Sequence, residues 1–110
     1  MTDNDLTEEE TELALSAKDA HNLIEMCNTN GWKFIKESYF DTRLKECKEY
    51  LGDIKNTDMS LIQAKRLMLE FIQTLLDEIT TQVSVGLKDE EELEKRKEKK
   101  KKRERGKLSK

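Results

Sequence analysis

Residues 60–83 of the chain read SLIQAKRLMLEFIQTLLDEITTQV. Apolar side chains recur in this segment at alternating steps of three and four residues, which is the spacing of a coiled-coil seam on one face of an α-helix. The seam consists of Leu61, Ala64, Met68, Phe71, Ile72, Leu75, Ile79 and Val83. Four further apolar residues widen it: Ile62, Leu67, Leu69 and Leu76. A stripe of this width exceeds what one facing helix covers, so we expect the helix to pack against two surfaces.

A second amphipathic segment precedes this one. Its apolar residues fall within about half of a helix circumference. They are Trp32, Ile35, Tyr39, Phe40, Leu44, Cys47, Tyr50, Leu51 and Ile54. Gly52 is placed to close this helix, and residues 53–58 form a connection of the length usual between antiparallel helices. Thr57, Asp58 and Ser60 are three alternative starts of the next helix. The pattern predicts an antiparallel helical hairpin of two long helices.

The rest of the chain flanks this hairpin. A short N-terminal helix is expected from Ser16 to Cys27, with Gly31 in a left-handed cap after it, and Gly86 is expected to end the second long helix. Residues 1–15 are polar and acidic, which predicts disorder. The sequence therefore predicts an all-α protein with a disordered acidic arm at 1–15, a helical hairpin domain at 16–86 and a charged tail at 87–110.

Charge is distributed unevenly along the chain. Residues 1–19 carry seven acids and one base, whereas residues 95–110 carry eleven Lys or Arg and two Glu. Glu91 and Lys95, like Glu92 and Arg96, are favourable i,i+4 pairs, so the tail is compatible with a solvated helix. Nine cations form its basic run: Lys95, Arg96, Lys97, Lys99, Lys100, Lys101, Lys102, Arg103 and Arg105.

The basic run has two alternative interpretations. It binds DNA, RNA or an acidic protein surface through salt-sensitive contacts, or it only solubilises the chain and pairs with the acidic blocks. No aromatic residue interrupts the run, so it offers no platform on which bases stack. We therefore expect neither sequence-specific nor single-strand recognition.

The sequence contains no motif of an enzyme or a metal site. It has only four glycines and no phosphate-binding loop, nucleophile elbow or pair of catalytic carboxylates. His21 stands alone, and Cys27 and Cys47 are too few for a disulfide framework or a zinc site. We expect no catalysis, no metal, no cofactor and no small-molecule substrate.

The foldable part of the chain is small, and a core of this size supplies only about 3–5 kcal/mol. Self-association or binding to another structural protein would supply the remaining stability. The residues expected at the protein interface are Trp32, Leu67, Met68, Phe71, Leu75 and Ile79. For Trp32 the favoured alternative is packing of the first helix onto the hairpin, and the other is anchoring of a partner. No apolar run reaches the roughly 20 residues of a membrane span, and the acidic start lacks a signal-peptide pattern, so an intracellular protein without membrane contact is expected.

Asn30-Gly31-Trp32-Lys33 precede a charged helix that runs to Leu51, a break, and a second helix over residues 60–76. In these features the chain resembles a group of small helical-hairpin proteins encoded among the head and packaging genes of tailed phages and prophages. The resemblance implies a virion-associated or packaging-accessory role, in the host cytoplasm or the virion, without enzymatic activity. The expected function is that of a structural or assembly protein acting through helical self-association or protein docking. The alternative is a nucleic-acid-binding accessory protein that uses the basic tail.

Overall fold

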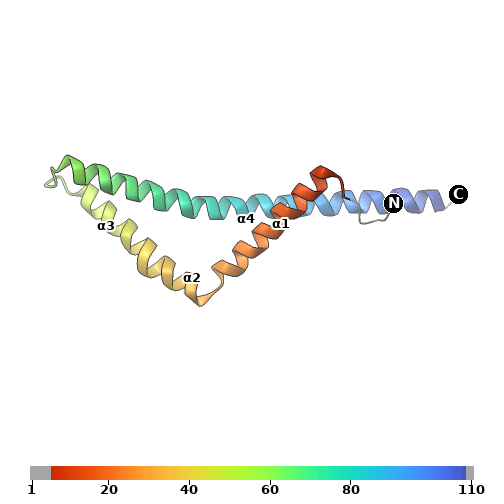
Figure 1. Cartoon of the computed structure of the whole chain (residues 1–110), viewed down its shortest axis with the longest axis horizontal. Helices are drawn as coiled ribbons and strands as arrows, with labels where there is room; N and C mark the ends of the chain where they lie inside the picture. The colour runs from red at the N-terminus through yellow and green to blue at the C-terminus, as the bar shows by residue number, and fades with distance from the viewer. Residues whose placement is uncertain (1–5, 109–110) are drawn as a thin grey trace. The chain divides into compact units, whose positions relative to one another are not determined.

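The computed structural model describes residues 6–108, and these residues form helices and contain no strand (Figure 1). This confirms the predicted all-α class. The elements are α1 (Glu8–Cys27), α2 (Asn30–Ile35), a π-helical turn η1 (Lys36–Phe40), α3 (Asp41–Gly52) and α4 (Met59–Leu108). The chain divides into two compact units. Of the described residues, unit 1 contains 6–24 and 81–108, and unit 2 contains 25–80.

In unit 1, α1 begins at Glu8, so the predicted disorder of residues 1–15 is wrong from residue 8 onward. Residues 1–5 of the predicted arm lie outside the described residues. Thr7 starts the helix through a reciprocal capping box: its Oγ1 accepts a hydrogen bond from the Glu10 backbone N–H at 3.1 Å, and Glu10 Oε1 accepts one from the Thr7 N–H at 3.4 Å. These two bonds satisfy donors that a helix start otherwise leaves unpaired. The N-terminal helix is therefore 20 residues long rather than short.

Small residues let α1 approach α4 closely in unit 1. Ala17 and Ala20 on α1 and Gly86 on α4 are buried, and Leu93 is the large apolar residue buried further along α4. Because α4 continues without interruption to Leu108, the predicted helix end at Gly86 is wrong. Gly86 is needed for the close contact and not for a turn, since no glycine in residues 6–108 has a positive φ. The predicted boundaries at residues 16 and 86 thus both fall inside helices.

In unit 2, two side chains define the helix starts that the sequence left open or misplaced. Asp58 caps α4, because its Oδ1 accepts hydrogen bonds from the backbone N–H groups of Ser60 at 3.0 Å and Leu61 at 3.2 Å. Thr29 caps α2, because its Oγ1 accepts from the Trp32 N–H at 3.1 Å. Gly31 lies in the first turn of α2, so the predicted left-handed cap at Gly31 is wrong.

The helix predicted over residues 32–51 contains the π-helical turn η1, which the sequence did not predict. Two contacts with a spacing of five residues accompany it. Lys36 Nζ lies 3.3 Å from Asp41 Oδ2, and Thr42 Oγ1 donates to the Glu37 carbonyl oxygen at 3.2 Å. A π turn takes more residues per turn than an α turn and so changes the angular position of everything after it. The apolar face of α3 is thereby displaced from the position that uniform α-helical spacing predicts.

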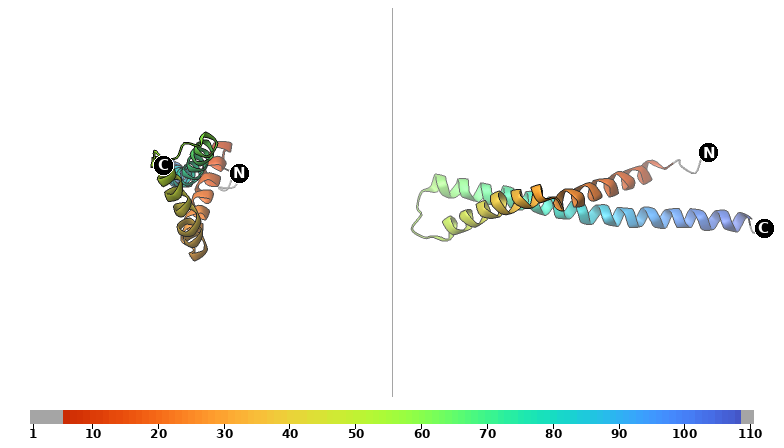
Figure 2. Two further views of the ribbon diagram at one scale, coloured as in Figure 1. Left: turned by 90° about the vertical axis from the view of Figure 1, so that its left-hand side faces the viewer. Right: turned by 90° about the horizontal axis from the view of Figure 1, so that it is seen from below.

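The core of unit 2 is thin. Cys47 on α3 and Ile72 on α4 are its buried apolar residues. The Lys65 ammonium of α4 lies 5.8 Å from the centroid of the Tyr50 ring of α3. The connection at residues 53–58 joins the end of α3 to the start of α4, as predicted, and these two helix ends lie side by side (Figures 1 and 2). Few side chains are enclosed, which leaves much apolar surface in contact with solvent.

Candidate interaction surfaces

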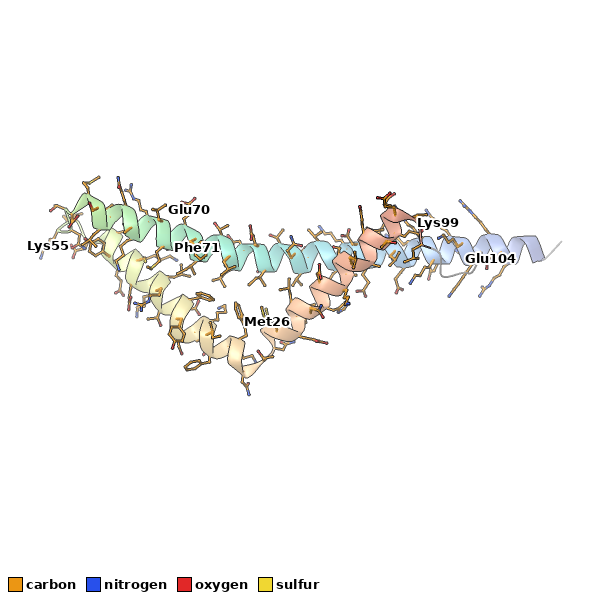
Figure 3. The ribbon with its side chains drawn as sticks, viewed as in Figure 1. Met26, Lys55, Glu70, Phe71, Lys99 and Glu104 are labelled. Carbon is orange, nitrogen blue, oxygen red and sulfur yellow. The ribbon has the colours of Figure 1, made fainter. Side chains whose placement is uncertain are left out.

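The residues predicted at the protein interface differ in exposure. Leu67 is 67% exposed, Phe71 69% and Met68 42%, whereas Leu75 and Ile79 are half-buried. All five lie on α4, and Phe71 leaves that helix on a different side from Glu70 (Figure 3). Single exposed apolar residues are common on protein surfaces, but a contiguous group of them marks a binding surface.

Within unit 2, the apolar residues of α4 form two parallel rows with coiled-coil spacing. The first row is buried or half-buried by the chain itself: Ile62, Leu69, Ile72, Leu76 and Ile79. The second, which we call the exposed row, consists of Leu61, Ala64, Met68, Phe71 and Leu75. Every member of the exposed row except the half-buried Leu75 is solvent-exposed. The wide apolar stripe predicted from the sequence thus consists of one row that the chain buries or half-buries and one row that is mostly exposed to solvent.

Trp32 does not belong to the exposed row. It lies on α2, is half-buried, and its ring centroid is 5.9 Å from that of Phe40. This aromatic contact lies within the α2–η1 segment, and the predicted role of Trp32 in joining the first helix to the hairpin stays a prediction. Phe34 and Tyr39, which were not predicted as interface residues, are both exposed and form an edge-to-face pair with centroids 6.0 Å apart.

The second candidate surface is the basic run of α4. The structure places its cations on one continuous helix in unit 1, so they are held at fixed intervals. Six lysines and two arginines of the run have exposed side chains: Lys95, Lys97, Lys99, Lys100, Lys101, Lys102, Arg103 and Arg105. Arg96 is half-buried. Lys95 lies 3.7 Å from Glu91, one of the i,i+4 pairs predicted from the sequence.

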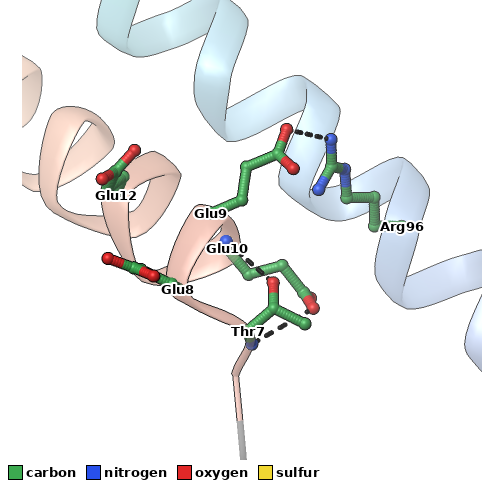
Figure 4. A pocket seen from close by; sticks show the side chains of 6 residues that line it. All are labelled: Thr7, Glu8, Glu9, Glu10, Glu12 and Arg96. Carbon is green, nitrogen blue, oxygen red and sulfur yellow. Dashed lines mark hydrogen bonds and ion pairs between the residues drawn. The ribbon is translucent and has the colours of Figure 1, made fainter.

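Two of these cations are held by the N-terminal acids of α1. Arg96 Nη2 lies 2.8 Å from Glu9 Oε1 (Figure 4). Arg96 Nε lies 3.1 Å from Glu92 Oε1. Lys100 Nζ lies 2.8 and 2.9 Å from the two carboxylate oxygens of Glu10, which is only 2% exposed. One predicted alternative was that the basic run pairs with an acidic block. Arg96 and Lys100 form such pairs, with Glu9 and Glu10.

These pairs shift the ionisation of the groups that form them. The hydrogen bond from Arg96 holds the pKa of Glu9 below its ordinary value of 4.5. The hydrogen bond from Lys100 lowers the pKa of Glu10, and this outweighs the opposing effect of burial. The carboxylates of Glu9 and Glu92 raise the pKa of Arg96. Each member of the cluster is thus stabilised in its charged form.

Glu9 and Glu10 were not singled out as site residues from the sequence. The signal that could have placed them is the spacing of Thr7 and Glu10, which is that of a capping box at a helix start. His21, which stands alone in the sequence, is exposed. In the structure it pairs with Glu90 through Nε2, and so adds a third polar contact between α1 and α4 within unit 1, after Glu9–Arg96 and Glu10–Lys100.

Two classes of site are not found in the described part of the chain. The His, Cys, Asp and Glu side chains of residues 6–108 form no cluster of three or more that could hold a metal ion. No helix among these residues combines the length and apolar character needed to cross a membrane. No protein-family model, curated protein or solved structure matches the chain.

Proposed function

We propose that the protein is a non-enzymatic structural or assembly protein that acts through association of helices. The observation that carries this proposal is the exposed row on α4, in which Met68 and Phe71 are exposed to solvent beside a row that the chain buries or half-buries. Full burial of a large apolar side chain contributes about 1.5–3 kcal/mol relative to full exposure. Covering the exposed row and the adjacent Leu67 would therefore stabilise a complex substantially.

The proposal includes the arrangement of α3 and the first part of α4 as one antiparallel hairpin. The contact of Lys65 with the Tyr50 ring at 5.8 Å and the short connection at residues 53–58 support this arrangement. A hairpin that buries one row of α4 presents the neighbouring row on its outside. Its function is then to offer a rigid helical surface to a partner helix.

A charge-matched pair of variants tests the proposal. Phe71→Glu places a carboxylate in the exposed row, and Gln73→Glu adds the same charge at an exposed polar position of α4 outside the row. We expect sedimentation velocity of the full chain to show concentration-dependent association in the wild type and in Gln73→Glu, and a large weakening in Phe71→Glu. Circular dichroism checks that both variants keep the helix content of the wild type.

Association with a different protein predicts another result. A photo-crosslinking residue at position 71 would then capture a defined partner in the cell of origin, and the same residue at position 73 would not. A chain that stays monomeric, combined with identical crosslinking at positions 71 and 73, would contradict the proposed function.

Binding of nucleic acid through the basic run is the second candidate function. The observation that favours it is the exposure of Lys95, Lys99 and Lys102 on one regular helix. Cations held in this way release counterions from a duplex, which makes binding insensitive to sequence and strongly dependent on salt.

A triple replacement of Lys95, Lys99 and Lys102 by Gln tests this candidate against a matched control. Replacement of Lys45, Lys48 and Lys55 by Gln removes the same charge from exposed positions outside the run. Fluorescence anisotropy with duplex DNA at several salt concentrations should show loss of affinity and a shallower salt dependence only for the first set. Equal losses for both sets would exclude the basic run as the binding site.

We place this function in the assembly of a phage head or its packaging apparatus, in the host cytoplasm or the virion. This setting is supported by the resemblance at residues 30–33, 51 and 60–76 alone. The exposed row and the basic run support an interaction protein in any setting.

A further inference from the structure

We propose that a depression on the basic run of α4 binds backbone phosphates of duplex nucleic acid, and that the first turn of α1 occupies it as an intramolecular competitor. This inference rests on the second candidate function and specifies its contact site and its regulation. The site lies within unit 1, which contains both the first turn of α1 and the basic run.

The depression lies beside Glu10 and has a volume of about 150 Å³. Four cations of the basic run line it together with that carboxylate: Arg96, Lys99, Lys100 and Arg103. Their spacing along α4 gathers them within roughly 100° of the helix circumference and along roughly 10 Å of its length. Cations this close repel one another unless an anion lies among them. The depression is therefore a site that favours an anion.

In the folded chain, the anion at this site is the carboxylate of Glu10. Its two oxygens lie 2.8 and 2.9 Å from Lys100 Nζ, and the residue is only 2% exposed. Glu9 holds Arg96 beside it at 2.8 Å. Carboxylates and phosphates both offer charged oxygen acceptors to Lys and Arg. The first turn of α1 thus occupies the position that a phosphate group would take.

The first turn can leave α4 while the rest of α1 stays in place. The ion pairs of Glu9 and Glu10 hold this turn on α4. The close-packed part of the interface lies further along α1, where Gly86 approaches Ser16 and Ala20. Helix ends open more readily than packed helix centres. A polyanion that binds Lys100 and Arg96 therefore needs to displace only the first turn.

The form of the cationic stripe favours a duplex over the other polyanions. A duplex carries one negative charge for roughly each 1.7 Å of its axis, so a stripe about 10 Å long can meet several phosphates at once. Arginines such as Arg96 and Arg103 bind phosphate through two parallel N–H bonds. The run contains no aromatic residue on which the bases of a single strand could stack.

Amide hydrogen exchange of the full chain, with and without saturating duplex DNA of random sequence, tests the displacement. In the folded chain the Glu10 N–H donates to Thr7 Oγ1 and the Thr11 N–H donates to the Thr7 carbonyl oxygen. We expect exchange of these two amides to rise several-fold when the duplex binds, because the first turn leaves α4. The amides of residues 20–24 should keep their exchange rates.

A charge-matched pair of variants tests the position of the site. Lys99→Gln with Arg103→Gln removes two cations that line the depression, whereas Lys97→Gln with Lys101→Gln removes two exposed cations of the same helix outside it. The slope of log affinity for duplex DNA against log salt should fall by about 1.8 in the first variant, for two lost phosphate contacts. It should stay near the wild-type value in the second.

Four results would overturn the inference. Unchanged or slower exchange at residues 10 and 11 in the bound chain would show that the first turn stays on α4, and equal slopes in the two variants would show that the depression is not the contact site. In both cases the duplex still binds, so the second candidate function stands. An equal rise in exchange with inorganic phosphate, at the same phosphate concentration, would assign the site to a small anion.

The fourth result is the absence of duplex binding even when Glu9 and Glu10 are both replaced by Gln, which would overturn the second candidate function as well. Binding of polyglutamate by that variant would then assign the depression to an acidic protein. Association through the exposed row is measured separately by sedimentation, so its outcome is independent of these results.

Discussion

A Cβ atom placed on Gly86 would lie 2.3 Å from the Cβ of Ala20 and 2.5 Å from the backbone oxygen of Ser16. Real Cβ atoms do not approach other heavy atoms so closely, so any larger residue at position 86 must push α1 away from α4 in unit 1. Gly86, which the sequence predicts at a helix end, is therefore a packing residue inside a helix.

Gly86→Ala should destabilise the protein, although alanine is the better helix former. The gain in helix propensity is about 1 kcal/mol. Overpacking of a close contact costs about 1–3 kcal/mol. The nearest atoms include a backbone carbonyl that cannot rotate aside, so we expect the cost to exceed the gain. Gly106→Ala is the control, because a Cβ there meets nothing within 4 Å. Urea unfolding that shows Gly86→Ala to be as stable as Gly106→Ala would contradict the close approach.

Thr7→Ala should shorten or loosen the start of α1. The substitution removes the acceptor of the Glu10 N–H hydrogen bond at 3.1 Å. Loss of such a cap costs about 0.5–2 kcal/mol. Hydrogen exchange of the amides at residues 9 and 10 measures the effect locally. Thr11→Ala is the control, since its hydroxyl bonds only the Thr7 carbonyl within the helix. Equal exchange in the two variants would rule out the capping role.

The pairing of α1 with α4 in unit 1 should weaken in acid. The pKa values of Glu9 and Glu10 are lowered from 4.5 in the folded chain, so the unfolded chain binds protons more readily. The stability that these carboxylates contribute is complete above pH 4.5 and is lost as the pH falls through their lowered values. Thermal unfolding followed from pH 7 to pH 3 measures this loss.

A double variant identifies the carboxylates responsible for the acid effect. Replacing Glu9 and Glu10 by Gln should flatten the pH dependence over this range. Replacing Glu8 and Glu12 by Gln makes the same charge change on side chains that point away from Arg96, and should leave the dependence close to that of the wild type (Figure 4). A pH dependence that flattens in the Glu8 and Glu12 variant but not in the Glu9 and Glu10 variant would assign the acid effect to other groups.

Duplex DNA should bind more tightly when Glu9 and Glu10 are replaced by Gln, if the basic run is a nucleic-acid site. The substitutions remove the 2.8 Å contacts that hold Arg96 and Lys100 to α1, which makes Lys100 available to phosphates and leaves Arg96 paired with Glu92 alone. The slope of log affinity against log salt should steepen by about 0.9 for each added phosphate contact. Anisotropy titrations at several salt concentrations provide the measurement. An unchanged affinity and slope would show that the acids do not compete with phosphate.

Some of this structure was predictable because local chemistry decided it. The apolar spacing of residues 60–83 predicted a helix, Gly52 is the last residue of α3, and Asp58 was among the three candidate caps of α4. In each case the determining interactions lie within a few residues of one another. The same holds for the width of the apolar stripe on α4. The sequence alone indicates that this stripe is wider than one facing helix covers.

The remaining features depend on residues distant in the sequence. In the sequence, Gly86 has the features of a helix end, and only its contact with Ala20 shows that it is a packing residue. Glu10 has the features of a solvated acidic arm, and only its ion pair with Lys100 shows that it belongs to a helix contact. The π turn at Lys36–Phe40 has no local sequence signal of its own. Composition predicts disorder for the N-terminal arm because it reflects neither the capping box at Thr7 nor the contacts with α4.

The dependence of the thermal unfolding midpoint on protein concentration tests most directly whether the chain associates with itself through the exposed row of α4. A chain that associates in its folded state is stabilised by mass action, so its midpoint rises with concentration. We expect such a rise for the wild type and for Gln73→Glu over a hundredfold range of concentration, and none for Phe71→Glu. A wild-type midpoint that stays constant over that range, at the value of Phe71→Glu, would contradict association of the chain with itself through the exposed row.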